Sequence, residues 1–243
     1  MLGYYLANLA RHGRIDPLEY YPCPRYRVVY VENAKVACTA IKQLLYPETS
    51  YEALGQEAFH HALHAEARHR PPRGTEDFLY FSVFRDPVAR LFSCYKDKIA
   101  GAAAHGRPGI FHTRFHRAVH GLFGGTDPAR PGLSFDAFAQ AVAAVPDCLR
   151  DRHTMSQAPI RAAVLGAAHG FAGRYEHLAE DWATLAARTG LPPLPALNQS
   201  HKSPCDAPEL SDRGRDALAH AFVADFALLG YPLPTTAVPE AGA

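Results

Sequence analysis

The sequence predicts an α/β fold in which a parallel sheet is covered by helices on both faces. Two segments carry this prediction, residues 27–45 and 80–99, because each has a short apolar run followed by a polar loop and an amphipathic helix. A further strand is expected near residues 166–175, between two helical patterns. With 243 residues, 48% of them hydrophobic and 20% charged, the chain is long enough for one large domain.

The segment 80–99 reads YFSVFRDPVARLFSCYKDKI and joins a strand to a helix. Residues 78–84 are mostly aromatic and aliphatic, with one β-branched valine, as in a buried strand. Pro87 fits the first turn of the helix, and Asp86 is expected to cap the N–H groups there. The residues expected on the buried side of this helix are Val88, Leu91, Phe92, Tyr95 and Ile99.

Polar residues in the same segment indicate a corner that could hold an anion. Arg85 follows the strand directly, and ligands of open α/β sheets bind at the carboxyl ends of strands. Arg90, Ser93 and Asp97 share a second face of the helix. The structural alternative is that the two arginines form ion pairs with Asp86 and Asp97, since such networks also gather charges.

The segment 27–45 reads RVVYVENAKVACTAIKQLL and has the features of a phosphate site. Residues 28–31 are expected to form a strand and residues 39–45 a short helix, with Lys35 in the loop between them. Loop N–H groups, a helix N-terminus, an ammonium and the Thr39 hydroxyl are groups that hold phosphate. The loop lacks the glycines of a Walker A loop, which disfavours a nucleoside triphosphate. A plain first strand and turn is the structural alternative.

Together the two segments resemble the carbohydrate sulfotransferases that use 3′-phosphoadenosine 5′-phosphosulfate (PAPS), in the branch with the chondroitin, dermatan and HNK-1 type enzymes and bacterial relatives. That family has a PKV-(A/G)-C/S-T-x-x-K loop, here AKVACTAIK at residues 34–42. It also has an R-D/N-P-x-x-R-x-x-S-x-Y segment, here RDPVARLFSCY at residues 85–95. The loop departs from the pattern at Ala34 and Ala40, which could weaken the hold on the cofactor.

Fainter matches extend the resemblance from about residue 26 to residue 231. A helix at residues 135–145 precedes a D-x-H-x-x-x-Q stretch, and GRYEHLAEDW and DFALLGY follow in the family's order. The resemblance implies a three-layer, P-loop-like sulfotransferase fold with a central parallel sheet flanked by helices. It implies a single domain over residues 1–243, with a cofactor core at about 26–99 and 134–231. Residues 1–25 are then a lead-in, residues 100–133 a variable insertion with a helix near 111–120, and residues 232–243 a flexible tail.

The matched positions imply roles for individual residues. Lys35 is expected beside the phosphosulfate bridge, and Thr39 with nearby backbone N–H groups at the 5′-phosphate. Arg85 and Ser93 are expected at the 3′-phosphate, with Arg90 and Asp97 as support, and Arg174 or Tyr175 near the nucleotide. The full set of expected cofactor-binding residues is Lys35, Val36, Ala37, Cys38, Thr39, Ala40, Arg85, Ser93 and Arg174.

A general base is expected among the 14 histidines, because a sugar hydroxyl is a weak acid. His60 fits best, since Phe59-His60 matches a hydrophobic-His pair of the resembled family, and Lys35 with His60 forms the expected catalytic set. His61, His64 and His153 are alternatives, and His153 with Asp151 could instead orient a loop. His60 and His64 are four residues apart, but no acidic or cysteine partner completes a zinc site, so no metal is expected.

The function expected from the resemblance is transfer of the PAPS sulfuryl group to a hydroxyl of a carbohydrate or glycoconjugate, giving adenosine 3′,5′-bisphosphate. A P-loop-like small-molecule kinase is an alternative that the missing Walker glycines disfavour. A non-catalytic module that binds a glycan or nucleotide is a second alternative. Acceptor contacts are expected in residues 101–133, whose cationic candidates are His112, Arg114, His116 and Arg117.

Composition narrows the partners and the compartment. The net charge of +1 gives no general affinity for nucleic acid, and no apolar stretch is long enough to span a membrane. The five cysteines contain no CxxC pair, which disfavours a disulfide framework and favours a reducing compartment. A cytoplasmic location is therefore expected, and within the resembled family the chain looks more like a soluble bacterial member. Neither the acceptor nor the oligomeric state follows from the sequence.

Overall fold

The computed structural model describes residues 2–100, 114–123, 127, 132–195 and 209–234. The chain divides into two compact units. The sheet unit comprises residues 17–85 and 157–203, and the helical unit comprises residues 1–16, 86–156 and 204–243. Because each unit is built from separated stretches of chain, the division does not follow the boundaries expected from the sequence, and the single domain stays a prediction.

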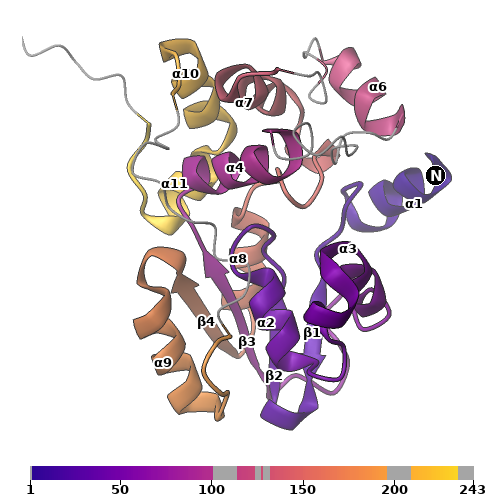
Figure 1. The fold of residues 1–243 in the computed structure, drawn as a ribbon, viewed down its shortest axis with the longest axis vertical. Coiled ribbons are helices and arrows are strands. Elements are labelled where there is room, and N and C mark those ends of the chain that lie inside the picture. Colours follow the sequence, from indigo (N-terminus) through magenta and orange to yellow (C-terminus); the bar gives the residue numbers. More distant parts are fainter. Residues whose placement is uncertain (1, 101–113, 124–126, 128–131, 196–208, 235–243) are drawn as a thin grey trace, which may run out of the picture. The chain divides into compact units, whose positions relative to one another are not determined.

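The sheet unit contains four strands in the order β1-β2-β3-β4 (Figure 1). Their bounds are β1 Tyr20–Cys23, β2 Val28–Val31, β3 Leu79–Phe84 and β4 His169–Arg174. β2, β3 and β4 are parallel, which confirms the prediction, whereas β1 runs antiparallel to β2 at the edge. The sequence did not predict β1, because its four residues include Pro22, which is tolerated only at the edge of a sheet.

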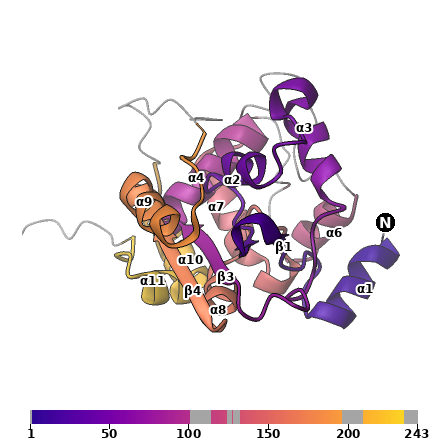
Figure 2. The ribbon, with the colours of Figure 1, turned by 90° about the horizontal axis from the view of Figure 1, so that it is seen from below.

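Helices cover both faces of this sheet (Figures 1 and 2). One face carries α2, α3 and α9, and the other carries α8. Their bounds are α2 Cys38–Leu45, α3 Tyr51–Leu63, α8 Ala158–Leu165 and α9 Leu178–Thr189, with short 3₁₀ turns at Pro24–Tyr26 and Tyr175–His177. Gly170 of β4 permits the close approach of α8, since an added Cβ would lie 2.5 Å from the Val164 carbonyl oxygen. The sheet unit is therefore three-layered, as the resemblance implied.

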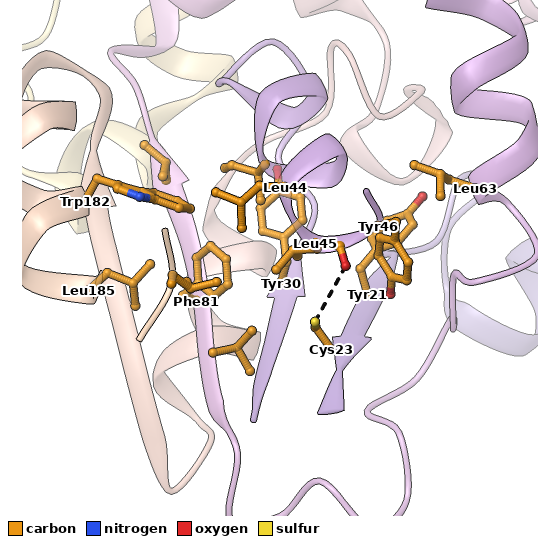
Figure 3. Close-up of a cluster of buried hydrophobic side chains, with 14 of the residues drawn as sticks. Tyr21, Cys23, Tyr30, Leu44, Leu45, Tyr46, Leu63, Phe81, Trp182 and Leu185 are labelled. Atoms are coloured by element: carbon orange, nitrogen blue, oxygen red, sulfur yellow. Dashed lines mark hydrogen bonds between the residues drawn. The ribbon is translucent and has the colours of Figure 1, made fainter. Parts of the chain in front are cut away.

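An aromatic core fills the space between the sheet and α2, α3 and α9 (Figure 3). Tyr30 of β2 and Phe81 of β3 are neighbours in register, with ring centroids 5.3 Å apart. The Trp182 ring of α9 meets Phe81 edge-on at 6.0 Å. Successive side chains of a strand point to opposite faces of the sheet. Every second residue of β2 and β3 therefore faces this helical layer.

Polar atoms of this core tie the end of α2 to β1. The Cys23 thiol donates to the Leu45 carbonyl oxygen at 3.7 Å (Figure 3). The Tyr46 hydroxyl donates to the Pro22 carbonyl oxygen at 2.8 Å. Burial raises the pKa of the Cys23 thiol and of the Tyr46 phenol. Both groups are therefore held in their neutral form.

The helical unit is built on a separate apolar core. Its elements are α1 Leu2–His12, α4 Pro87–Tyr95, a π-helical turn Lys96–Ala100, α6 Arg114–Leu122, α7 Phe135–Ala144, a 3₁₀ turn Asp147–Leu149, α10 Asp212–Ala221 and α11 Val223–Leu229. Leu91 and Cys94 of α4 pack with Phe138 of α7 and with Phe222 and Phe226. Residues 111–113 of the expected insertion helix lie outside the described residues, whereas α6 covers the rest of it.

The start of α4 follows the sequence prediction. The Asp86 carboxylate accepts from the Ala89 N–H at 2.8 Å, and Pro87 occupies the first turn. Arg90, however, is only 2% exposed and donates to the Met155 and Arg152 carbonyl oxygens at 2.7 and 2.8 Å. Burial lowers the pKa of this guanidinium. Arg90 therefore supports the chain around residues 152–155, and its expected support of the Arg85 corner stays a prediction.

None of the helices in the described ranges has the length and apolar character needed to cross a membrane.

Tyr46→Phe tests the neutral phenol of the sheet unit. At neutral pH we expect the variant to lose about 1 kcal/mol of unfolding free energy, because the Pro22 carbonyl oxygen loses its donor. Since the folded pKa of Tyr46 is raised, the unfolded chain loses the phenolic proton first and wild-type stability falls as pH rises above about 10. We expect a shallower fall in the variant, measured by urea denaturation across this range. Parallel pH profiles would contradict the raised pKa.

Candidate active site

The three parallel strands end at one edge of the sheet, and the loops that follow them form the candidate site. Phe84 of β3 is in register with Arg174 of β4, so Arg85 and Tyr175 are the next residues of adjacent strands. β2 ends at Val31 on the same edge and leads into the loop 32–37. Ligands of open α/β sheets bind at this edge, as the sequence predicted for Arg85.

The loop 32–37 has an unusual backbone. Lys35 and Ala37 have φ values of 70° and 55°, in the left-handed region that non-glycine residues rarely adopt. Each such residue costs about 1 kcal/mol, and alternation of left-handed residues turns successive N–H groups toward a concave anion site. Strain of this kind is found where a loop has a function. The loop thus has the left-handed residues that a phosphate cradle uses, although it lacks the glycines of a Walker A loop.

Helix α2 begins directly after this loop, and its N-terminus faces the same edge of the sheet. Ala37 occupies the N-cap position, and its methyl group cannot accept a hydrogen bond from the first turn. The first N–H groups and the positive end of the helix dipole are therefore suited to an anion rather than to a side-chain cap. Cys38 and Thr39 are the first two residues of the helix, so the sequence-predicted residues 35–40 span the end of the loop and the first turn of α2.

The Thr39 hydroxyl and the His60 ring meet at this loop, with Oγ1 and Nε2 3.3 Å apart. His60 comes from α3, which is kinked at Gly55, where φ is 73°. Phe59 is fully buried and fixes this part of α3, while its ring lies edge-on to the His60 ring at 5.5 Å. In this hydrophobic-His pair, the buried Phe59 anchors α3 and the His60 imidazole projects toward Thr39. The two predicted residues, 21 positions apart in the chain, come together here.

The other candidate histidines lie elsewhere. His61 and His64 are exposed, and the His64 Nδ1 lies 3.3 Å from the buried Glu19 carboxylate. His153 belongs to the helical unit, where its backbone N–H and its Nδ1 approach the Asp151 Oδ1 at 2.6 and 3.2 Å. Asp151 and His153 form a local turn here, and the loop-orienting alternative stays a prediction. Over the described ranges, no three His, Cys, Asp or Glu side chains cluster as a metal site requires.

Arg85 is half-buried at the end of β3. Its guanidinium lies over the Tyr175 ring, 4.5 Å from the centroid, which fixes the side chain by a cation–π contact. Among the described residues, no carboxylate forms an ion pair with it. A positively charged side chain that is oriented but not neutralised is suited to an anionic ligand.

For two further sequence-predicted residues, Arg174 and Ser93, the structure gives the element on which each lies. Arg174 ends β4, and its backbone N–H donates to the Asp181 carboxylate at 2.5 Å. Ser93 lies on α4 of the helical unit and is half-buried. Its joint action with Arg85 on a 3′-phosphate stays a prediction.

Buried polar residues behind the loop were not predicted as part of the site. The Lys42 Nζ forms an ion pair with Glu32 at 2.8 Å and lies over the Tyr21 ring, with both charged side chains almost fully buried. Gln157 and Asn33 form a second buried contact, between the Asn33 Nδ2 and the Gln157 Oε1 at 2.8 Å. The sequence signals were Lys42 as the last residue of the AKVACTAIK match and Gln157 as the final residue of the D-x-H-x-x-x-Q match.

Ala37→Gly tests the strained loop. Glycine adopts the left-handed region without penalty, so we expect the substitution to leave the free energy of unfolding unchanged or to raise it by up to about 1 kcal/mol. Ala40→Gly, three residues later within α2, is the matched control and should lower stability by about 1 kcal/mol or more. Urea denaturation of both variants measures the difference. Equal losses in the two variants would contradict the left-handed conformation of Ala37.

Searches of curated proteins and of solved structures found no match to this chain. A comparison with protein families gave a match to the sulfotransferase family over residues 19–232. The match includes the loop 32–37, the end of β3, and the segments around His60 and Gln157, and it covers most of the chain. The protein is thus a member of the sulfotransferase family.

Proposed function

We propose that the protein transfers the sulfuryl group of PAPS to a hydroxyl group of a carbohydrate or glycoconjugate, releasing adenosine 3′,5′-bisphosphate. Membership of the sulfotransferase family supports sulfuryl transfer as the reaction class. The observation that carries the proposal is the contact of Thr39 with His60 at the left-handed loop. The contact places a hydroxyl that would bind the 5′-phosphate beside an imidazole that would accept the proton.

The groups at the carboxyl edge suit a nucleotide with anionic groups at both its 5′ and its 3′ position. Lys35, the N–H groups of the loop and the first turn of α2 would hold the 5′-phosphosulfate end. Arg85, oriented on Tyr175, would hold the 3′-phosphate, which distinguishes PAPS from ATP. Ser93 completes this set as a prediction from the family motif.

Sulfuryl transfer makes one bond and breaks one. The acceptor oxygen bonds to sulfur, the bridging bond from sulfur to the phosphate oxygen breaks, and the hydroxyl proton leaves the acceptor. His60 takes that proton as the general base. The Lys35 ammonium stabilises the negative charge that develops on the leaving phosphate oxygen. No redox step is involved, because sulfur exchanges one bond to oxygen for another and keeps its oxidation state.

The carbohydrate nature of the acceptor rests on the family resemblance rather than on contacts. Most of residues 101–133, where acceptor contacts are expected, lie outside the described residues. The acceptor class therefore needs an assay with a pool of glycans rather than a single compound.

A thermal-shift measurement tests the nucleotide. At about 100 times the dissociation constant we expect adenosine 3′,5′-bisphosphate to raise the melting temperature by roughly 5 to 10 °C, because a ligand bound only to the folded state stabilises it. ATP and GTP at the same concentration should give smaller shifts, since they carry no 3′-phosphate for Arg85. An equal or larger shift with ATP and Mg²⁺ would instead favour a kinase.

His60→Ala tests the base. We expect transfer of radiolabelled sulfate from PAPS to a glycan pool to fall by about 10²- to 10⁴-fold, since the proton acceptor is removed. Binding of adenosine 3′,5′-bisphosphate, measured by calorimetry, should stay nearly unchanged. His61→Ala, at the next and exposed position of α3, is the control and should keep its activity. Full activity of His60→Ala would remove His60 from the mechanism.

A further inference from the structure

We propose that Gln157 and Asn33 are positioning residues that fix the phosphate loop relative to Arg85 and thereby set the preference of the site for a 3′-phosphorylated nucleotide. The inference rests on the proposed function, which assigns the loop to the 5′ end and Arg85 to the 3′-phosphate. It adds two side chains, those of Gln157 and Asn33, to which the proposed function gives no contact with either phosphate end of the nucleotide. Their side chains are fully buried in the sheet unit.

The Gln157 side-chain amide bonds to both backbone polar groups of Arg85, the N–H and the carbonyl oxygen. The Arg85 N–H donates to the Gln157 Oε1 at 3.1 Å, and the Gln157 Nε2 donates to the Arg85 carbonyl oxygen at 2.7 Å. The two bonds pair the side-chain amide with the peptide groups of one residue, as a neighbouring strand would. They continue the sheet pairing one residue beyond the end of β3 and so fix where the Arg85 side chain leaves the backbone.

The orientation of the Gln157 amide follows from its partners. A backbone N–H can only donate and a carbonyl oxygen can only accept, so Oε1 must face the Arg85 nitrogen. The same Oε1 accepts a second hydrogen bond, from the Asn33 Nδ2 at 2.8 Å. No substitute of the same length reproduces this pattern, because glutamate lacks the donor and methionine lacks both groups.

Asn33 carries the connection into the loop. Its Nδ2 also donates to the Val83 carbonyl oxygen at 2.9 Å, so the loop is attached to β3 two residues before Lys35. In the described part of the chain, the Asn33 Oδ1 is buried with no hydrogen-bond partner. A buried acceptor without a donor is unfavourable, so the amide is retained here for its donor end.

The two amides therefore join the loop to the strand that carries Arg85. A ligand that uses both anchors depends on the distance between them, whereas a ligand that uses only the loop does not. Loosening the connection should penalise adenosine 3′,5′-bisphosphate more than adenosine 5′-monophosphate. A residue that only stabilised the fold would lower the melting temperature without changing the ratio of the two affinities.

Calorimetry with these two nucleotides on the full chain tests the inference. We expect the wild-type preference for the bisphosphate to fall by about tenfold in Gln157→Met, which keeps the side-chain length and removes the amide. Asn33→Ala leaves the two Gln157–Arg85 bonds in place and should lower the preference in the same direction. This second variant decides the matter if Gln157→Met does not fold.

Thr75→Val is the matched control. Thr75 is buried in the same unit, before β3, and its hydroxyl lies 2.7 Å from both the Pro72 carbonyl oxygen and the Tyr80 hydroxyl. The substitution removes buried hydrogen bonds away from the carboxyl edge, so the melting temperature should fall while the affinity ratio stays the same. An unchanged ratio in both Gln157→Met and Asn33→Ala would overturn the positioning role. A wild-type protein without preference for the bisphosphate would overturn the proposed function itself, and the inference with it.

Discussion

Parallel pairing of β2, β3 and β4 is the constraint on which the candidate active site depends. It brings the ends of three strands to one edge, so that the loop 32–37, Arg85 and Tyr175 become neighbours although they are distant in the chain. An antiparallel partner would place its end at the opposite edge, as β1 does. The outer helices hold this arrangement. On one face α2, α3 and α9 pack against the aromatic core, and on the other face α8 packs against the sheet.

Behind the edge, buried polar groups hold the loop in one conformation. A buried charge is costly unless it is paired, and Lys42 with Glu32 satisfies this requirement across the start of the loop and the helix that follows it. The amides of Asn33 and Gln157 form a buried contact without charge, in which the donor end of Asn33 is used and, among the described residues, its Oδ1 has no partner. Lys35 and Ala37 have left-handed backbone angles in this loop. Such angles persist only where the surrounding structure fixes them.

Group transfer between oxygen atoms requires accurate placement more than covalent participation by the protein. The proposed site fits this requirement, because Arg85 follows a strand and the first N–H groups of α2 belong to a helix, and His60 is the residue proposed to take the proton. The whole chain is nearly neutral, with a net charge of +1, so the proposed affinity for an anion would be local. It would come from Lys35, Arg85 and the N–H groups of the loop and α2 at one edge of the sheet.

The sequence by itself determined the features that depend on neighbouring residues. The order strand, loop, helix at residues 28–45, the start of α4 at Asp86 and Pro87, and the family motifs are local patterns that a sequence displays directly. Tertiary structure alone decided the contacts between distant positions. Gln157 reaches Asn33 across 124 residues, and Arg90 turns its guanidinium to carbonyl groups more than 60 residues away. No local periodicity encodes such pairs, because burial and hydrogen bonding depend on which elements the fold brings together.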